Sequence, residues 1–303
     1  MFSGLMPAMV TPFDERGEVD LQATDAVVGR FVEAGVDGIS ALGSTGEFSH
    51  LDTNERRRFA EELVRIVAGR VPLVIGVGAT GTREAVALTR HAEEAGADGV
   101  LAVSPFYWKV GEEALFRHFA AVAEAAEIPT LIYNFPMLTG LDLSPGLVAR
   151  VASECSNVIG LKDTVTEYSH TVRVLREVKP VRPDFVVLAG FEDQILPTML
   201  AGGDGSICGL ANVAPELLVS LIKSARDGDL ETAADLHRRV LSLMAMGSLS
   251  DTPLGAIKLA MNALGVPITP AVRRPALPAP EEAREGVEDA LREAGLLAAR
   301  EAH

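Results

Sequence analysis

The sequence has few of the residues on which disulfide, zinc and membrane proteins depend. Its 303 residues include only two cysteines, Cys155 and Cys208, which are too far apart for a disulfide scaffold or a structural zinc site. No apolar run reaches the roughly 18 residues that a membrane span needs, so we expect no membrane partner. The first residues contain neither a basic segment nor a long apolar one. We therefore expect no signal peptide and a cytoplasmic location.

Positive charge is also scarce. The chain has 27 lysines and arginines against 42 aspartates and glutamates, a formal net charge of −15. The densest basic run, Arg56-Arg57-Arg58, is flanked by Asp52, Glu55, Glu61 and Glu62, as on a solvated helix face. A nucleic-acid binder would carry a basic stripe, so we expect no nucleic-acid partner.

Short apolar segments alternate with amphipathic ones over the first two thirds of the chain. The apolar segments predict strands at 5–10, 38–42, 73–77, 100–103, 130–133, 158–161, 185–189 and 206–210, and helices are predicted at 21–33, 55–68 and 83–94, among others. Several strands are apolar without alternation, which is typical of parallel strands covered on both faces. Eight strand–helix units without a central break predict an α/β protein with a closed (β/α)8 TIM barrel rather than an open sheet.

After the last predicted strand the pattern contains helices only, at 215–226, 230–246, 253–264 and 280–296. We therefore expect a barrel domain over 1–225 and a C-terminal helical region over 226–303 packed on the barrel. A short repeat, Ala-Gly-x-Asp-Gly, occurs at 34–38, 95–99 and 201–205, each time between a helical segment and a strand. Because glycine relieves the left-handed turn at a helix end, the repeat predicts loops between helices and strands.

A glycine pattern, G-x-G-x-x-G, spans 76–81 between a predicted strand and a helix. Such a pattern can bind a dinucleotide, with an acidic residue about 20 residues further on. The acid must end the second strand, whereas Asp98 begins one. A tight strand-to-helix loop is the favoured interpretation, and we expect no cofactor.

Gly43-Ser44-Thr45-Gly46-Glu47 follows the second predicted strand directly. The segment can be a turn with a helix cap. It can also be an anion pocket, in which backbone N–H groups and the hydroxyls of Ser44 and Thr45 hold a substrate carboxylate at the carboxyl end of the barrel.

The chain has five lysines against 22 arginines, and Lys162 stands at the end of an apolar strand. The carboxyl ends of barrel strands carry the chemistry, and an apolar setting disfavours the ammonium, leaving more neutral amine to attack a ketone. The alternative is a buried ion pair with Asp163. Adjacent strand residues point to opposite faces, which disfavours that pair.

Tyr133 stands at the corresponding end of the preceding strand. A phenol beside a lysine can relay the protons that Schiff-base formation requires, although it can also be a half-buried aromatic. Each residue alone is ambiguous, but together Lys162 and Tyr133 indicate carbinolamine chemistry.

These residues resemble the dihydrodipicolinate synthase/N-acetylneuraminate lyase family of class I pyruvate-dependent aldolases. Five motifs carry the resemblance in the right order, at 43–47, 104–107, 133–136, 160–163 and 202–207. The resemblance implies that Lys162 forms the Schiff base, that Tyr133 shuttles protons with Thr45 behind it, and that no metal is needed. It implies that Ser44 and Thr45 contact the carboxylate and hydroxyl groups of the substrate. It also implies a homo-oligomer, a dimer or dimer of dimers, in which Tyr107 reaches the neighbouring subunit's site.

One departure bears on the substrate. Synthases of the lysine pathway have an arginine for the carboxylate of their aldehyde where this chain has Leu138, so aspartate semialdehyde is disfavoured. The chain resembles more closely the aldolases of 2-keto-3-deoxygluconate and 2-keto-3-deoxypentonate. Further substrate-binding residues implied by this branch are Leu138, Thr164, Gly190, Glu192 and Ile207. Glu192 and Asp193 can instead be the cap and first turn of a helix, and the two interpretations weigh equally.

The sequence thus predicts reversible cleavage of a 2-keto-3-deoxy sugar acid to pyruvate and a short aldehyde, glyceraldehyde or glycolaldehyde. Three alternatives stay open. A sugar-acid dehydratase could use the same imine, the chain could be a dihydrodipicolinate synthase, or the barrel could bind a keto acid without catalysis.

Overall fold

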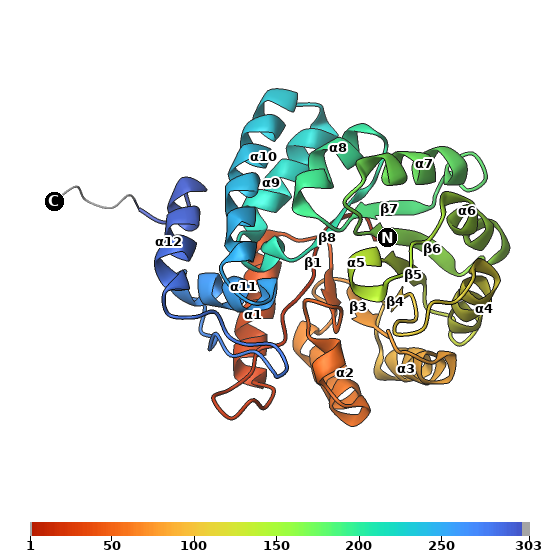
Figure 1. The fold of residues 1–303 in the computed structure, drawn as a ribbon, viewed down its shortest axis with the longest axis horizontal. Helices are drawn as coiled ribbons and strands as arrows, with labels where there is room; N and C mark the ends of the chain where they lie inside the picture. Colours follow the sequence, from red (N-terminus) through yellow and green to blue (C-terminus); the bar gives the residue numbers. More distant parts are fainter. Residues whose placement is uncertain (1, 299–303) are drawn as a thin grey trace.

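The computed structural model describes residues 2–298, and its centre is one parallel sheet of eight strands. The order in the sheet is β1-β8-β7-β6-β5-β4-β3-β2, and a bridge between Ala8 and Ser40 joins the two edge strands (Figure 1). The predicted (β/α)8 barrel is therefore confirmed. The strands are β1 (Gly4–Pro7), β2 (Ile39–Ala41), β3 (Leu73–Gly76), β4 (Gly99–Val103), β5 (Thr130–Asn134), β6 (Val158–Asp163), β7 (Val186–Ala189) and β8 (Gly205–Cys208).

Helices follow the strands and surround the barrel. They are α1 (Leu21–Ala34), α2 (Thr53–Val67), α3 (Thr82–Ala95), α4 (Glu112–Ala123), α5 (Pro136–Thr139), α6 (Pro145–Glu154), α7 (Tyr168–Val178), α8 (Ile195–Leu200), α9 (Pro215–Asp227), α10 (Leu230–Met244), α11 (Pro253–Ala263) and α12 (Ala283–Glu293). Every predicted strand and helix overlaps one of these elements.

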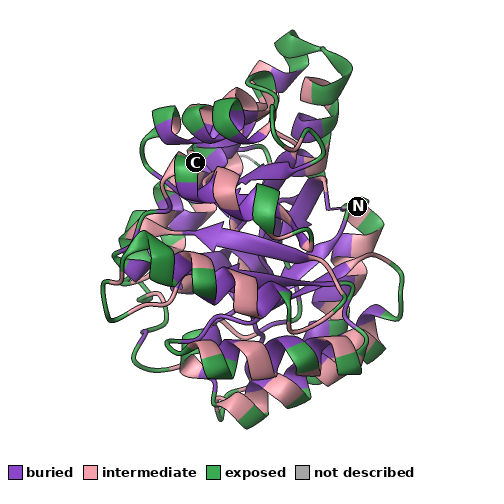
Figure 2. Cartoon of the chain, turned by 90° about the vertical axis from the view of Figure 1, so that its right-hand side faces the viewer, coloured by how far each residue is buried: buried purple, intermediate pink, exposed green. Residues whose placement is uncertain are grey.

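The barrel has two separate apolar layers. The inner one fills the barrel with side chains that alternate along the strands. It includes Met6, Val74, Leu101, Leu131, Leu188 and Ile207. The outer layer lies between the strands and the helices. Figure 2 shows the strands buried and the outer helix faces exposed. Because buried polar groups normally have hydrogen-bond partners, a polar side chain inside the barrel that lacks one is a candidate functional group.

The Ala-Gly-x-Asp-Gly repeat closes the end of the barrel where strands begin. Gly35 and Gly96 end α1 and α3 in the left-handed conformation, as predicted. Each repeat aspartate then forms two bonds with one residue of a neighbouring strand. The backbone N–H of Asp37 donates to the Leu5 carbonyl at 2.9 Å, and its side chain accepts from the Leu5 N–H at 2.8 Å. Asp98 with Leu73 and Asp204 with Val187 repeat this pair of bonds.

The C-terminal helices lie against one side of the barrel, beside α1 and α9 (Figure 1). The predicted boundary after residue 225 falls within the last turn of α9, and the two-domain division stays a prediction, with 299–303 outside the described residues. No single helix within 2–298 has the length and apolarity to cross a membrane. Leu230–Ser248 and Pro253–Ala263 meet that test only as a pair, bent by 119°.

Candidate active site

Lys162 and Tyr133 are paired neighbours on β6 and β5, inside the carboxyl end of the barrel. The Lys162 Nζ lies 4.2 Å from the centroid of the Tyr133 ring. Both side chains are buried, with 5% and 2% exposed. The parallel register and the two-residue side-chain period together produce this contact. The structure therefore brings together the two residues that the sequence singled out.

The amine of Lys162 has no hydrogen-bond acceptor and no ion-pair partner within residues 2–298. The other buried lysine, Lys258, is fully engaged, because its Nζ contacts the Glu47 carboxylate and two backbone carbonyls. The Lys258 amine is thus held in place by its three acceptors, whereas the Lys162 amine has none and can approach a bound ligand. Burial raises the pKa of the Cys208 thiol to about 12, which removes that thiol as a competing nucleophile.

Asp163 points away from Lys162, so the alternative of a Lys162–Asp163 ion pair is wrong. The Asp163 carboxylate lies outside the barrel and accepts from Asn134 at 3.0 Å, His170 at 3.0 Å and Thr171 at 2.7 Å. The second ring nitrogen of His170 lies 2.8 Å from the Leu143 carbonyl. Burial lowers the pKa of His170, but Asp163 and that carbonyl outweigh it, and the net pKa is raised. The His170 imidazole, with an oxygen within hydrogen-bond distance of each ring nitrogen, therefore braces the end of β6.

Thr164 follows Lys162 by two residues and faces the same side of β6. It is buried, and its hydroxyl has no hydrogen-bond partner. Gly190, which follows β7, lies directly against it, because an added Cβ there would be 1.7 Å from the Thr164 hydroxyl. Position 190 therefore has no room for a side chain, which explains the glycine. A buried hydroxyl without a partner beside the Lys162 strand is a candidate substrate contact.

Glu192 lies in the barrel mouth and, with Asp193, in the first turn of the short 3-10 helix Glu192–Gln194, so the predicted first-turn position is right although Glu192 is not the cap. Its carboxylate is buried and accepts from the Leu210 N–H at 2.7 Å, and the short helix it begins has no side-chain cap. Burial raises the pKa of Glu192, opposed by backbone hydrogen bonds and by the charge of Lys162. Gly209 lies between Glu192 and Thr45, because a Cβ there would be 3.7 Å from the Glu192 carboxylate and 3.8 Å from the Thr45 hydroxyl.

The Gly43–Glu47 segment forms a tight loop after β2. Leu42, which precedes the loop, and Glu47, its last residue, have φ values of 56° and 54°, a left-handed conformation that costs non-glycine residues about 1–3 kcal/mol. Ser44 and Thr45 are half-buried, and neither side chain forms a hydrogen bond within residues 2–298. The two predicted hydroxyls are therefore free to bind a ligand.

The rim of the barrel mouth carries exposed aromatic and apolar side chains. Tyr107 is 86% exposed and packs on Trp108, with the rings 5.9 Å apart. Leu138 is 60% exposed on α5. Within one chain Tyr107 makes no contact with Tyr133 or Thr45, and its predicted action on a neighbouring subunit stays untested. Ile207 lies with Tyr133 in the inner cluster, as expected of a residue bordering the Lys162 pocket.

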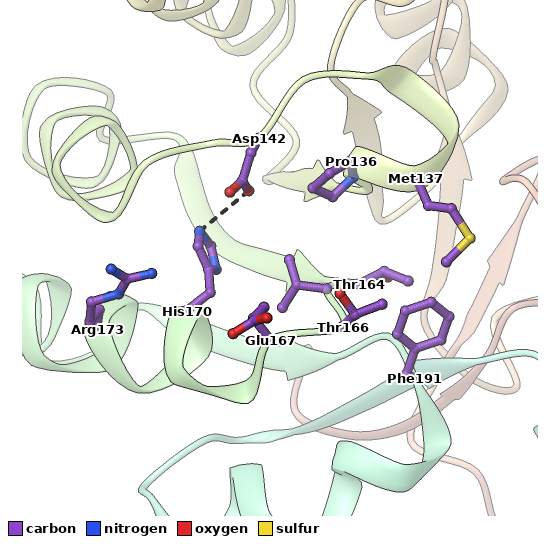
Figure 3. A pocket seen from close by; sticks show the side chains of 10 residues that line it. Pro136, Met137, Asp142, Thr164, Thr166, Glu167, His170, Arg173 and Phe191 are labelled. Carbon is purple, nitrogen blue, oxygen red and sulfur yellow. Dashed lines mark ion pairs between the residues drawn. The ribbon is translucent and has the colours of Figure 1, made fainter.

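A cavity of about 570 Å³ lies beside the end of β6. Figure 3 shows His170 directed towards Asp142, 3.5 Å away, while Thr166 and Phe191 lie further along the cavity. Glu167 and Arg173 line its outer part. Thr164, which follows the end of β6, lines this cavity, whereas Lys162 and Tyr133 are not among its lining residues.

Sequence reasoning missed two parts of this site. The Asp163–His170 network was missed because His170 is one of six scattered histidines. The Glu47–Lys258 contact joins residues that are 211 positions apart. The only signal for the latter was a lysine within the apolar stretch of α11.

An eight-stranded parallel barrel with a buried, unpartnered lysine beside a tyrosine has the parts of a Schiff-base aldolase. The chain belongs to the dihydrodipicolinate synthetase family, whose model matches residues 1–294.

Named relatives cover nearly the whole chain. A protein of Escherichia coli K12 named "Probable 2-dehydro-3-deoxy-D-pentonate aldolase YjhH" is 43% identical over 98% of both chains. A 4-hydroxy-tetrahydrodipicolinate synthase of Thermotoga neapolitana is 35% identical over 98% of this chain and 100% of its own. The crystal structure of YagE of E. coli K12, a prophage protein of the same family in complex with pyruvate, has a TM-score of 0.96 and 40% identity. It covers 98% of this chain and all of that one.

Proposed function

We propose that the protein is a class I aldolase that reversibly cleaves a 2-keto-3-deoxy sugar acid to pyruvate and a short aldehyde. The contact between the Lys162 amine and the Tyr133 ring carries the proposal. Its support is that the amine is buried and unpartnered, and that the phenol hydroxyl has no hydrogen-bond partner within the described residues.

The proposed steps use these two groups. The neutral Lys162 amine attacks the C2 ketone, and the Tyr133 hydroxyl relays protons so that the carbinolamine loses water and becomes an iminium. The C4 hydroxyl loses its proton to Tyr133, the C3–C4 bond breaks, and its electrons enter the iminium to give an enamine and the aldehyde. Protonation of the enamine at C3 and hydrolysis of the imine then release pyruvate and return the amine.

We assign the substrate carboxylate to the Ser44–Thr45 loop, because its two hydroxyls have no hydrogen-bond partner within the described residues and the backbone N–H groups of such a loop can bind an anion. Thr164, Gly190, Glu192 and Ile207 border the reacting carbons. A neutral polyol tail is favoured over an anionic aldehyde, because Leu138 supplies no charge where lysine-pathway synthases have an arginine.

Carbon count defines the aldehyde. A five-carbon acid gives pyruvate and glycolaldehyde, and a six-carbon acid gives pyruvate and glyceraldehyde. Similarity to the protein named as a pentonate aldolase supports the five-carbon acid, and the six-carbon acid is the alternative.

Borohydride trapping tests the proposal. The protein is incubated with pyruvate and borohydride, and the modified peptide is identified by mass spectrometry. We expect a reduced pyruvyl adduct on Lys162, no adduct in folded Lys162→Ala, and an unchanged adduct in Lys223→Ala, whose lysine is exposed on α9. Absence of the adduct in the folded wild-type protein removes the mechanism. If the adduct forms, product analysis with a 2-keto-3-deoxy acid separates aldol cleavage from dehydration.

We also propose that the protein is a homo-oligomer. Two large aromatic side chains, Tyr107 and Trp108, are exposed together at the rim, and Tyr107 has a φ of 84°. Adjacent exposed aromatics are typical of protein interfaces. Sedimentation of the wild type should show a dimer or tetramer, and Trp108→Ala should dissociate it at least in part. A wild-type monomer would exclude this assignment. A cytoplasmic location stays a prediction from the sequence.

A further inference from the structure

Glu47, the last residue of the Gly43–Glu47 loop, is tied to the C-terminal helical region. Its side chain is fully buried, and its Oε1 lies 2.6 Å from the Nζ of Lys258 on α11. Its other oxygen accepts from the Arg273 backbone N–H at 2.8 Å. A loop of the barrel mouth is therefore anchored from a part of the chain more than 200 residues away.

The Lys258 ammonium is saturated with acceptors. Besides Glu47 it donates to the carbonyls of Thr11 and Ala271, each at 2.8 Å, and it lies 4.4 Å from the centroid of the Phe13 ring. Three hydrogens meet three acceptors, so each donor is fixed in direction. Loss of the Lys258 charge leaves the buried Glu47 carboxylate with the Arg273 N–H and with His50, whose Nδ1 lies 3.3 Å from its Oε2. Loss of the Glu47 charge leaves the Lys258 ammonium with backbone carbonyls alone.

The loop that this pair anchors does not hold its shape unaided. Glu47 is in the left-handed region, and such a residue keeps that conformation only where its surroundings enforce it. The Thr11 hydroxyl donates to the Gly46 carbonyl at 2.6 Å, so the β1–α1 loop braces the same segment. Arg273, whose backbone N–H binds Glu47, is itself held in place by an ion pair between its guanidinium and Glu55 on α2.

We propose that the Lys258–Glu47 pair is a positioning element that holds Ser44 and Thr45 in the conformation that binds the substrate carboxylate. The inference rests on the proposed function, which assigns the carboxylate to this loop. Neither Lys258 nor Glu47 touches the substrate. If the pair is broken, the loop populates other conformations. The apparent affinity for the substrate then falls in proportion to the fraction of molecules whose loop keeps the binding conformation. The chemistry at Lys162, on the far side of the barrel mouth, is left intact.

The test measures how borohydride trapping at Lys162 depends on pyruvate concentration. In Lys258→Met we expect the half-saturating concentration of pyruvate to rise at least tenfold, with the maximal trapping rate within threefold of wild type. Lys223→Met is the matched control, because Lys223 also pairs with a carboxylate but on the exposed face of α9. That variant should saturate as the wild type does.

Glu47→Gln is the second variant, since it keeps the shape of the side chain and removes the charge. We expect its half-saturating concentration to rise severalfold, and we expect Glu47→Gln with Lys258→Met to be no worse than Lys258→Met alone. Folded variants that saturate like the wild type overturn the inference, even if their melting temperatures fall. If Lys258→Met does not fold, Glu47→Gln decides alone. A wild type that forms no adduct instead removes the proposed function, so the two failures are distinguishable.

Discussion

Asn134 and Asp163 are paired across β5 and β6, one residue beyond Tyr133 and Lys162, and the Asn134 amide donates to the Asp163 carboxylate at 3.0 Å. Because side chains alternate along a strand, this bond lies outside the barrel while the lysine and tyrosine lie inside it. The outer bond fixes the spacing of the two strand ends. A change outside the barrel should therefore be felt at the reactive amine.

The first prediction concerns Asp163. Asp163→Ala should lower the free energy of unfolding by about 3 kcal/mol, because it leaves the buried donors of Asn134, His170 and Thr171 without their acceptor. Urea denaturation measures the change. Asp184→Ala is the control, since that carboxylate is exposed and 3.6 Å from its arginine. It should change the free energy by less than about 0.5 kcal/mol. Equal effects at both positions would contradict the assignment.

The second prediction concerns the pH dependence that His170 contributes. Its pKa is raised in the folded state, so the stabilisation by its charged form is fully present below its unfolded pKa and is lost as the pH rises through the folded pKa. Wild type should exceed His170→Gln in unfolding free energy by more at about pH 5.5 than at about pH 8.5. A difference that is constant with pH would show that the imidazole is neutral throughout.

His118 should give the opposite pH dependence, which is the third prediction. Burial lowers its pKa to about 4, and its Nδ1 lies 3.0 Å from the Thr82 hydroxyl. The unfolded chain takes up a proton before the folded one does, so wild type should lose stability relative to His118→Gln as the pH falls from 6.5 towards 4. The full effect is on the order of 3 kcal/mol. Thermal unfolding across this range measures it, and a loss on the alkaline side would refute the assignment.

The fourth prediction tests the close approach at Gly190. In Gly190→Ala the new methyl group would meet Thr164, including its backbone Cα at 3.0 Å, so we expect a loss of about 1–3 kcal/mol in unfolding free energy and weaker pyruvate trapping. Gly29→Ala is the control, because nothing lies within 4 Å of that position inside α1. It should stabilise the protein by about 0.5–1 kcal/mol. A Gly190→Ala variant with the stability and the pyruvate trapping of the wild type would contradict the close contact between Gly190 and Thr164.

The fifth prediction separates chemistry from stability. Tyr133→Phe removes a hydroxyl that has no hydrogen bond within residues 2–298 and keeps the ring beside Lys162. The rate of aldol cleavage should fall by about 10²- to 10⁴-fold. The melting temperature should stay nearly unchanged. Stopped assays for released pyruvate give the rate, and activity close to wild type would exclude Tyr133 as the proton shuttle.

Strands and helices could be predicted because their apolar periodicity is local. Most ends agree within a few residues, and β6, whose apolar segment spans 158–161, includes Lys162 as expected and continues to Asp163. Polar residues look like the end of a strand when read alone. In the barrel, the register with Tyr133 and Asn134 carries the strand on.

The candidate site was only partly predictable. Lys162 and Tyr133 could be found because strand ends and a rare residue type mark them. The role of Glu192 could not, because a carboxylate before a helix suggests a cap, and only the tertiary fold shows that it accepts from Leu210 instead. Glu47 and Lys258 could not be paired either, since no periodicity connects residues so distant in sequence.

The paired hydrogen bonds between the three aspartates of the Ala-Gly-x-Asp-Gly repeat and the neighbouring strands lie towards the end of the barrel where the strands begin, whereas Lys162 lies where they end. One end of the barrel thus carries these stabilising hydrogen bonds, and the other carries the Lys162 site. The loops around Lys162 can then change in evolution without loss of the hydrogen bonds that hold the opposite end of the barrel together.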